Sequence, residues 1–231
     1  MGFLPAVCGT KEKACKAWGM LSEVYKLSGS ATQIELLSLV EKLNRKADIH
    51  GILVQLPLQR IDSEKIIGVI DPAKDVDAFS PLNTGKVMLG NYLYAPCTPA
   101  GIIELIKRSG IDIAGKRCVV IGRSNIVGKA LAMLLMHENG TVTICHSRTL
   151  ELVAACREAD ILVAAIGKPN FVTADMVKKG ACVIDVGVNR LPNGKVCGDV
   201  DFDAVSHAAG FITTVPGGVG PMTKTMLLKN T

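Results

Sequence analysis

The second half of the chain alternates short apolar runs with segments of helical periodicity. The apolar runs cover residues 118–121, 141–145, 160–165, 181–186 and 210–214. Runs such as ILVAAIG (161–167) and ACVIDVG (181–187) are typical of strands that are covered on both faces of a sheet. Helix-period segments at 150–158 and 173–179 separate the later runs. Strands that alternate with helices predict a parallel, doubly wound sheet.

A helix is also expected near the start of the chain. Residues 30–46 have the apolar spacing of an amphipathic helix, and Ser30 with Gln33 fits a capping box. The apolar positions of this helix are Ile34, Leu37, Val40 and Leu43.

A strand, a short helix and a turn are expected to follow it. Residues 51–56 predict a buried strand that Pro57 ends. Asp62 predicts the N-cap of a helix through Ile70, and residues 71–79 are rich in turn formers. Together with the first helix, these elements predict an α/β domain. Thr98 and Pro99 then predict the N-cap and first position of another helix, which runs to Gly110.

A glycine turn follows the first strand of the second half. Gly122 and Gly128 occupy this turn, a helical segment comes next, and the second strand ends at Ser147 and Arg148. A strand–helix–strand unit of this kind places a dinucleotide pyrophosphate at the N-terminus of its helix. Units that bind NAD usually carry a carboxylate at the tip of the second strand, whereas this chain has Ser147 and Arg148 there, and Arg123 in the turn. These residues suit a 2′-phosphate and predict NADP as the cofactor.

The same turn has a weaker similarity to a phosphate-binding P-loop. Lys129 directly follows Gly128, but the spacing from Gly122 is one residue too long. Ala130 stands where a Ser or Thr would hold magnesium. Ser124 also replaces the second glycine of the dinucleotide fingerprint, so the turn alone is a modest signal.

Composition and charge bear on four further possibilities: nucleic-acid binding, a membrane span, disulfides and a metal site. The 231 residues carry a net charge of +5 with the basic residues dispersed, which suits an anionic ligand and gives little support to nucleic-acid binding. No apolar stretch is long enough to predict a membrane span. The eight cysteines contain no C-x-x-C pair and the histidines have no metal-ligand spacing, so reduced cysteines and no metal site are expected.

Three polar residues outside the glycine turn are candidates for chemistry, each with an ordinary alternative. Lys11 lies in a helix-like segment, where it either acts in a site or covers a solvated face. Gln55 ends a predicted strand, where an amide hydrogen-bonds a ligand or simply ends the strand. Asp77 either takes a bidentate bond from an amidine-like ring edge or only forms its turn.

Glycines mark three further positions. Gly167 and Gly187 follow predicted strands, at the sheet edge where doubly wound proteins bind ligands. A loop near the end of the chain is unusually rich in glycine and proline, which allows either close approach to a ligand or a tight turn. Its residues are Pro216, Gly217, Gly218, Gly220 and Pro221.

These motifs together resemble the bifunctional methylenetetrahydrofolate dehydrogenase/methenyltetrahydrofolate cyclohydrolase family. The matching stretches occur in family order over nearly the whole chain. They are KEKAC (11–15), GILVQLPL (51–58), DPAKDVDAF (71–79), PCTPAGI (96–102), VVIGRSNIVGK (119–129), TVTICHSRT (141–149), VIDVGVNR (183–190), GDVDF (198–202) and VPGGVGPMT (215–223). QLPL paired with KDVD, and VPGGVGPMT near the end, are the specific ones.

The resemblance implies two reactions in sequence. A hydride passes from the one-carbon bridge of 5,10-methylenetetrahydrofolate to NADP, a step that depends on alignment. Water then opens the methenyl product to 10-formyltetrahydrofolate, a step that needs acid–base help. The resemblance also implies a cytoplasmic homodimer that supplies one-carbon units for purine, amino-acid and formyl-methionine synthesis.

The resemblance also assigns roles to residues. Lys11 assists the hydrolytic step, Gln55 orients and tunes this lysine, and Asp77 binds the pterin edge of the folate. NADP is contacted by Thr98, Gly122, Arg123, Ser124, Ile126, Ser147 and Arg148. The nicotinamide and folate are bordered by Gly167, Gly187, Pro216, Gly217, Gly218, Gly220, Pro221 and Thr223.

The family pattern finally bears on domain organisation. It implies a folate-binding catalytic domain at residues 1–97 with 222–231, and a Rossmann-type NADP-binding domain with a parallel sheet at residues 98–221. The family has a folate-stacking tyrosine four positions before the lysine, where this chain has Val7. The family pattern also begins with several dozen more residues, including a first strand, so the catalytic domain is expected to be shortened at its N-terminus.

Two alternatives follow from these features. Val7 and the shortened N-terminus favour a non-catalytic relative that binds NADP. The other alternative is a monofunctional dehydrogenase, against which Lys11 and Gln55 argue. Ala78, Ser80 and Ala130 replace the family's usual glycine, histidine and proline, and these substitutions are expected to be tolerated.

Overall fold

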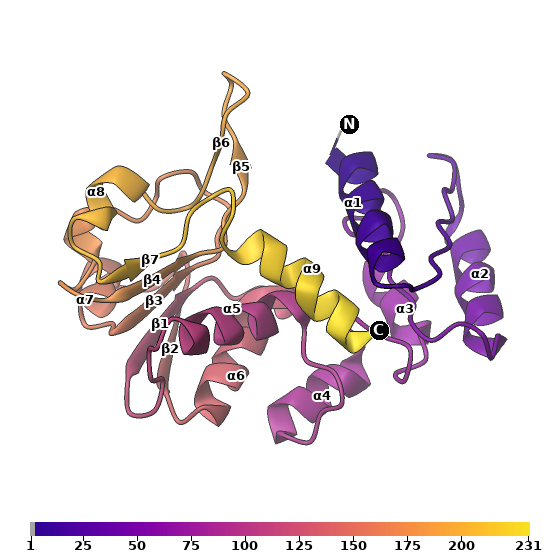
Figure 1. The fold of residues 1–231 in the computed structure, drawn as a ribbon, viewed down its shortest axis with the longest axis horizontal. Coiled ribbons are helices and arrows are strands. Elements are labelled where there is room, and N and C mark those ends of the chain that lie inside the picture. The colour runs from indigo at the N-terminus through magenta and orange to yellow at the C-terminus, as the bar shows by residue number, and fades with distance from the viewer. Residues whose placement is uncertain (1–2) are drawn as a thin grey trace.

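The computed structural model describes residues 3–231, with side chains described at residue 9 and from residue 11 onward. Four helices occupy residues 3–96, before the sheet-containing part begins (Figure 1). They are α1 (Phe3–Ala17), α2 (Gln33–Arg45), α3 (Ser63–Val69) and α4 (Pro81–Leu89).

The second part is built on a parallel sheet of five strands. The strands are β1 (Arg117–Ile121), β2 (Thr141–Cys145), β3 (Ile161–Ala164), β4 (Cys182–Asp185) and β7 (Phe211–Ile212). Their order across the sheet is β2-β1-β3-β4-β7, and every neighbouring pair is parallel. The prediction of a parallel, doubly wound α/β fold is therefore confirmed. Chain order reverses between β1 and β3, the position at which such sheets bind ligands.

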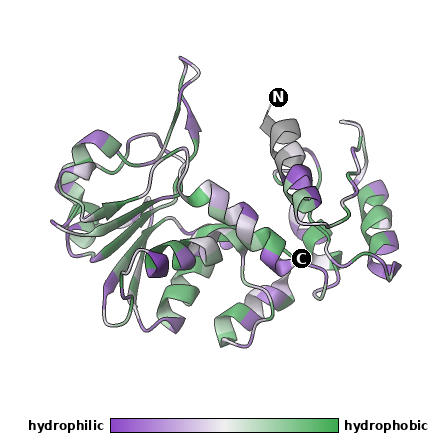
Figure 2. Cartoon of the chain, in the orientation of Figure 1, coloured by the Kyte–Doolittle hydropathy of each residue, from purple (hydrophilic) through white to green (hydrophobic). Residues whose placement is uncertain are grey.

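Both faces of this sheet are covered by apolar packing, as the runs that form β3 and β4 predicted. Along β1, Cys118 and Val120 enter the core that contains α5 (Cys97–Arg108) and α6 (Ala130–His137). Val119 and Ile121 enter the core on the opposite face, which Cys156 of α7 (Leu152–Arg157) and Val205 of α8 (Phe202–Ser206) complete. The strands carry hydrophobic colouring in Figure 2. Alternate side chains thus fix the two helical layers to one sheet.

Helices α2 and α3 pack together over a third core. Leu36, Val40, Leu43, Ile52, Ile66 and Ile70 form its buried part. The predicted capping box at Ser30 and Gln33 is wrong by two residues, because Thr32 is the N-cap and Glu35 its partner. Of the predicted apolar positions, Val40 and Leu43 are buried, whereas Ile34 is 76% exposed and Leu36 is buried in its place. Asp62 caps α3 as predicted, accepting from the backbone of Glu64 and Lys65.

The predicted strand at residues 51–56 is not formed. Within the described residues, this segment makes a single parallel bridge, between Ile52 and Asp75. The Ile52 backbone N–H donates to the Lys74 carbonyl at 2.7 Å. Of these residues only Ile52 is buried, and a strand also requires a continuous partner, which sequence periodicity does not reveal.

Several boundaries in the second part also differ from prediction. Helix α5 begins at Cys97 and Pro96 is its N-cap, so Thr98 does not cap it. Residues 173–179 form only a short 3₁₀ turn, Ala174–Met176, in place of a helix. The sequence did not predict α4 or the hairpin of β5 (Asn189–Arg190) and β6 (Val196–Cys197). The hairpin strands have two residues each, too short for a periodic signal.

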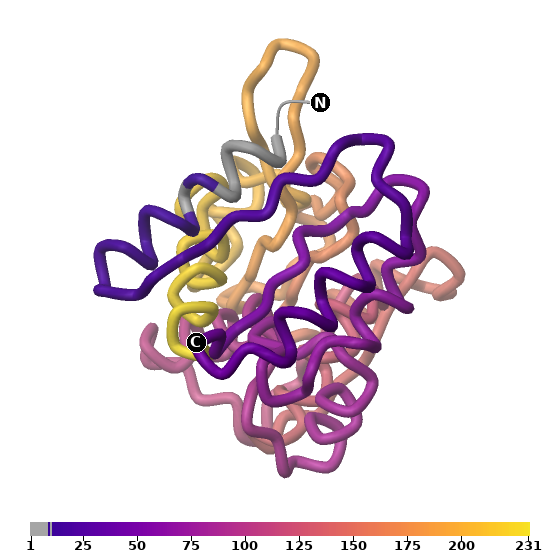
Figure 3. The backbone as a smooth tube through the Cα atoms, turned by 90° about the vertical axis from the view of Figure 1, so that its right-hand side faces the viewer, coloured from indigo at the N-terminus to yellow at the C-terminus, as the bar shows by residue number. Residues whose placement is uncertain are grey.

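The C-terminal helix connects the two parts of the chain. Helix α9 spans Val219–Asn230 and packs along α5 and against α1. Figure 3 shows its yellow tube beside the indigo N-terminal helix. The predicted glycine loop therefore ends at Gly218, and Gly220, Pro221 and Thr223 lie in the first turns of α9. Proline is tolerated in a first helical turn because the N–H it lacks has no helical partner there.

Candidate active site

Lys11 and Gln55 are brought together from segments far apart in the sequence. Helix α1 carries Lys11, whose Nζ donates a hydrogen bond to Gln55 Oε1 at 3.1 Å. The Gln55 Nε2 donates to the Leu56 carbonyl at 3.1 Å, which fixes the orientation of the amide. Both side chains are half-buried. The pair thus holds an ammonium group at a position that solvent or a ligand can reach.

Asp77 belongs to the same cluster. Burial raises the pKa of Asp77, and the nearby charge of Lys11 and a hydrogen bond with the Cys97 thiol only partly offset that rise. Burial beside this carboxylate likewise raises the pKa of Cys97. Asp77 is therefore a carboxylate held in a partly desolvated position, suited to a ligand that supplies paired N–H donors.

The neighbouring Asp75 has a structural role. Its carboxylate accepts from the backbone N–H groups of Phe79 and Ser80, at 3.2 and 2.8 Å, and from Asn83 Nδ2 at 3.0 Å. These bonds close the turn that presents Asp77. Ala78, in place of the family's glycine, has a φ of 56° and is fully buried. Ser80 caps α4 by accepting from the Asn83 N–H at 3.3 Å, so this substitution has a favourable local role.

Two residues that sequence reasoning missed hold this turn in place. Asn230 of α9 donates through Nδ2 to the carbonyls of Val76 and Ala95, at 2.8 and 3.0 Å. Lys74 donates through Nζ to the carbonyls of Asn44 and Lys46, both at 2.7 Å, and so ties the turn to the end of α2. Neither contact has a local sequence signal, since the Asn230–Val76 pair is separated by 154 positions.

The glycine turn after β1 requires its glycines. Gly122 has a φ of 129°, and a Cβ there would clash with the Ala165 carbonyl. A Cβ on Gly128 would clash with the carbonyl of Gly122. Ser124 Oγ accepts from the N–H groups of Val127 and Gly128, at 3.3 and 3.4 Å, and so caps the π-helical turn Asn125–Lys129. Close backbone packing therefore accounts for both glycines, and binding of a pyrophosphate at this turn stays a prediction.

The predicted phosphate-binding residues lie at the same edge of the sheet. Ile121 pairs with Cys145, so the loops that carry Arg123 and Ser147–Arg148 emerge side by side. All three side chains are exposed. The Arg148 backbone N–H donates to His146 Nδ1 at 3.1 Å, which gives His146 a turn-forming role. Ile126, 39% exposed, lies in the adjoining helical turn.

Thr98 and Thr223 join the predicted cofactor and substrate segments. Their hydroxyl groups share a hydrogen bond of 3.0 Å between α5 and α9. In the preceding loop, Gly217 has a φ of 113°, and a Cβ on Gly218 would lie 2.6 Å from the Thr214 carbonyl. These two glycines are explained by the turn. A Cβ added to Gly220 would meet no described atom within 4 Å, so backbone packing does not account for this glycine.

Gly167 and Gly187 lie after adjacent strands, β3 and β4, as predicted. Gly167 has a φ of 66°, and Gly187 packs directly against the Asp199 carboxylate. Cis peptide bonds occur at Leu56–Pro57 and Val215–Pro216, next to Gln55 and the glycine loop.

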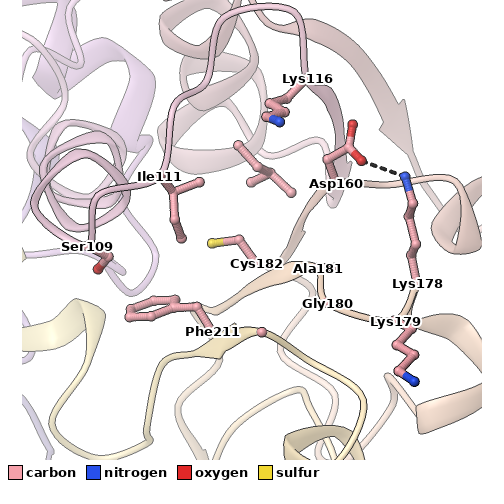
Figure 4. Close-up of a pocket in the computed structure, with 12 residues that line it drawn as sticks. Ser109, Ile111, Lys116, Asp160, Lys178, Lys179, Gly180, Ala181, Cys182 and Phe211 are labelled. Atoms are coloured by element: carbon pink, nitrogen blue, oxygen red, sulfur yellow. Dashed lines mark hydrogen bonds and ion pairs between the residues drawn. The ribbon is translucent and has the colours of Figure 1, made fainter.

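Two hollows described in the structure lie away from these residues. One, of about 350 Å³, lies at the amino-terminal ends of the strands, where Asp160 pairs with Lys178 at 2.6 Å (Figure 4). The other, of about 210 Å³, lies beside the β5–β6 hairpin. Neither is lined by a predicted catalytic or cofactor-binding residue.

The expectations about Val7, the cysteines, metal ligands and membrane spans can be compared only with the described residues. The side chain of Val7, at the position of the family tyrosine, lies outside the described residues. The seven described cysteines are free, and the described residues include no cluster of three or more potential metal ligands. Among the described helices, none is both long and apolar enough to cross a membrane.

Two family profiles match the chain. The profile for the catalytic domain of tetrahydrofolate dehydrogenase/cyclohydrolase matches residues 8–77. The profile for the NAD(P)-binding domain of the same enzymes matches residues 96–231. Between them they cover most of the chain.

Individual relatives agree with the profiles. The bifunctional protein FolD of Acetivibrio thermocellus is 59% identical over 223 residues, which cover 96% of this chain and 78% of that protein. The FolD crystal structure from Campylobacter jejuni has a TM-score of 0.96 and 47% identity, covering 98% of this chain and 81% of that one. A Trypanosoma brucei FolD complexed with NADP cofactor and inhibitor has a TM-score of 0.93 and 40% identity, covering 98% of this chain and 80% of that one.

Proposed function

Because this chain belongs to the tetrahydrofolate dehydrogenase/cyclohydrolase family, we propose that its Lys11–Gln55 pair and Asp77 form the catalytic centre for both reactions of that family. The protein is an NADP-dependent methylenetetrahydrofolate dehydrogenase and methenyltetrahydrofolate cyclohydrolase. The observation that carries the residue assignment is the hydrogen bond from Lys11 Nζ to Gln55 Oε1, at 3.1 Å.

In the hydrolytic step, Lys11 moves protons. Water adds to the methenyl carbon and loses a proton, and a carbon–nitrogen bond breaks as the released nitrogen becomes protonated. Both transfers need an acid–base group within hydrogen-bond reach. The Gln55 oxygen accepts one hydrogen bond from the Lys11 ammonium and so directs the remaining N–H groups. Gln55 acts through Lys11 and is a positioning residue for this step.

Asp77 holds the substrate. Its partly desolvated carboxylate accepts a pair of hydrogen bonds from the amidine-like edge of the pterin ring, and such charge-assisted pairs fix orientation as well as affinity. Asp75, Lys74 and Asn230 hold the turn that presents it. In the oxidative step, this anchoring aligns the one-carbon bridge for hydride transfer, which is the main catalytic requirement.

The residues at the carboxyl edge of the sheet fit NADP, the hydride acceptor. Gly122 and Gly128 keep the turn free of side chains where the pyrophosphate approaches, and Ser124 caps the helical turn behind it. Arg123, Ser147 and Arg148 supply the positive charge and hydrogen bonds for the 2′-phosphate. Thr98, Ile126, Gly167 and Gly187 border the remainder of the cofactor.

The glycine segment borders the folate on the other side. Pro216, Gly217, Gly218, Gly220, Pro221 and Thr223 lead from β7 into α9, beside Thr98. Gly220 is exposed with no described atom near an added Cβ, so a ligand can approach its backbone. We propose domain limits of 1–97 with 222–231 for folate binding and 98–221 for NADP binding.

The wider biological setting is part of the same proposal. We propose a cytoplasmic homodimer without nucleic-acid partners that supplies 10-formyltetrahydrofolate for purine and formyl-methionine synthesis and also takes part in amino-acid biosynthesis. A non-catalytic NADP-binding relative is not favoured by the comparisons. Retention of the Lys11–Gln55 hydrogen bond argues against a monofunctional dehydrogenase.

The test of this assignment is to separate the two activities by mutation. Lys11→Ala removes the acid–base group, and we expect methenyl hydrolysis to fall by about 10²–10⁴-fold. Hydride transfer needs no such group and should fall by less than about tenfold. Both rates are followed spectrophotometrically, in separate assays.

Lys13→Ala is the matched control. Lys13 lies on the same helix but is exposed, so its loss should leave both rates close to those of the parent. Equal losses of hydrolysis and hydride transfer in Lys11→Ala would show that this lysine only binds folate and would contradict the assignment.

A further inference from the structure

Two buried carboxylates, Asp185 and Asp199, lie at the carboxyl ends of the central strands. Asp185 is 3% exposed and Asp199 is fully buried. Asp185 ends β4, while Asp199 follows the β5–β6 hairpin. Ionised groups are rarely buried to this degree unless partners compensate for the lost hydration.

The compensation for Asp199 comes from the loop after β3. One carboxylate oxygen, Oδ2, accepts from the backbone N–H groups of Ile166 and Gly167, at 2.7 and 2.9 Å. The other, Oδ1, accepts from Asn189 Nδ2 at 2.9 Å. Asp199 therefore fixes two consecutive amides at the strand end where Gly167 turns.

Asp185 does the same for the loop after β4. Its Oδ1 accepts from the N–H groups of Gly187 and Asp199, at 2.9 and 2.8 Å, and Oδ2 accepts from Val200 N–H at 3.0 Å. A Cβ on Gly187 would clash with the Asp199 carboxylate, and a Cβ on Gly198 would clash with that of Asp185. The two acids and two glycines thus form one compact unit that packs against the loops after β3 and β4.

The hydrogen bonds of these two side chains require acceptors at both carboxylate oxygens. Every hydrogen-bond partner found for these two carboxylates among the described residues is an N–H donor, and neither carboxylate forms an ion pair there. An ionised carboxylate accepts at both oxygens, whereas an amide side chain accepts at only one. An Asp→Asn change at either position therefore leaves at least one loop amide or side chain without its acceptor.

We propose that Asp199, supported by Asp185, is a positioning residue for hydride transfer that holds the Ile166–Gly167 and Gly187 backbones against the nicotinamide. The inference rests on the proposed placement of the nicotinamide beside Gly167 and Gly187. It goes further by assigning the alignment of that ring to buried acids that do not themselves touch the cofactor. Loss of the unit should misalign the nicotinamide while the 2′-phosphate contacts continue to hold the cofactor.

The test is Asp199→Asn, assayed for both activities. We expect the kcat of dehydrogenation to fall by about ten- to a hundredfold, because small displacements from reactive geometry have effects of this size. The KM for NADP should change by less than about threefold, since the phosphate contacts are intact. Hydrolysis of methenyltetrahydrofolate, measured without NADP, should stay within about twofold of the parent because it depends on Lys11 and Gln55.

Asp160→Asn is the matched control on the same sheet. Asp160 also accepts from a backbone amide, Arg117 N–H at 2.9 Å, but it lies at the opposite edge, where Figure 4 shows it beside Lys178. This variant should retain both activities. If Asp199→Asn does not unfold cooperatively, Asn189→Ala replaces it, since this change removes one bond to Asp199 and keeps the carboxylate. It should lower dehydrogenation selectively, by several-fold.

The outcomes separate this inference from the proposed function. Equal losses of both activities in a folded Asp199→Asn protein, unchanged dehydrogenation, or a raised KM for NADP with unchanged kcat would each overturn the positioning role. Failure of the unmutated protein to turn over methylenetetrahydrofolate with NADP would instead overturn the function itself.

Discussion

Sequence motifs predicted some residues of this site and missed others that hold them in place. Lys11 and Gln55 belong to recognisable motifs, and their hydrogen bond confirms that the two motifs meet in space. Asn230 and Asp199 position neighbouring groups just as directly, yet neither was among the predicted site residues. Their partners lie in distant segments, and a single sequence contains no signal for such contacts.

Arg123 gives a residue-level prediction about cofactor choice. Its exposed guanidinium stands at the strand edge with Ser147 and Arg148, where it suits a charge-assisted bond to the 2′-phosphate. Arg123→Ala should weaken NADP binding by roughly 1.5–3 kcal/mol and leave the weaker NAD binding almost unchanged. Calorimetric titration with each dinucleotide measures this difference.

A cation on another surface serves as the control. Arg45→Ala, on α2, removes the same charge from an exposed pair with Glu41 and should not alter NADP affinity. Equal affinities of the unmutated protein for NAD and NADP would refute the role of Arg123.

Asp77 gives a prediction about pH. Because burial raises its pKa in the folded protein above the unfolded value, the ionised carboxylate destabilises the fold at neutral pH. This cost fades as the pH falls through the folded-state pKa toward the unfolded value, since both states then bind the proton. Asp77→Asn should therefore have a higher free energy of unfolding than the parent at pH 7, a difference that shrinks toward acidic pH, while folate binding weakens.

Urea unfolding of both proteins across this pH range measures the effect. NADP affinity, which does not involve Asp77, should be unchanged and verifies that the variant is folded. A variant that is less stable than the parent at pH 7 would show that Asp77 is held by interactions outweighing its burial.

At the scale of elements, the prediction was strongest where periodicity extends over several buried residues. The strands of the parallel sheet were located within one or two residues, and β1, β3 and β4 gave the clearest signal because nearly all of their residues are buried. Helix α4 and the β5–β6 hairpin were missed, since α4 buries only Asn83 and Val87 and the hairpin strands have two residues each. The apolar residues at 51–56 pack against the core of α2 and α3, but the segment forms only a single bridge.

The contact between α5 and α9 gives a prediction about packing. A Cβ on Gly101 of α5 would lie 2.9 Å from Met222 Cβ and 3.2 Å from the Met222 carbonyl carbon, so the helices touch through this glycine. Gly101→Ala should lower the free energy of unfolding by about 1–3 kcal/mol, the usual cost of overpacking. Chemical denaturation measures the change.

Gly85→Ala is the matched control for helix propensity. Gly85 lies within α4, is exposed, and has nothing within 4 Å of the added Cβ. This substitution should stabilise the protein by about 0.5–1 kcal/mol, because alanine is the better helix former. A Gly101→Ala protein as stable as Gly85→Ala would contradict close packing at that crossing.

At the scale of the whole molecule, one helix links the two predicted binding regions. Near its start, α9 bonds to Thr98 through Thr223, and near its end Asn230 holds the turn that carries Asp77. The predicted folate contacts and the predicted NADP contacts thus share one rigid element. The motifs predicted both groups of residues, but they could not predict this link, because the start of α9 has the composition of a loop.

The central claim is that the chain oxidises methylenetetrahydrofolate with NADP and hydrolyses the product in the same site. The most direct measurement follows absorbance after the unmutated protein is mixed with methylenetetrahydrofolate and either NADP or NAD. The expected result is NADPH formation accompanied by 10-formyltetrahydrofolate, at a rate at least about tenfold above that with NAD, as expected from loss of a charge-assisted phosphate contact. Absence of NADPH formation, or equal rates with the two dinucleotides, would contradict the account.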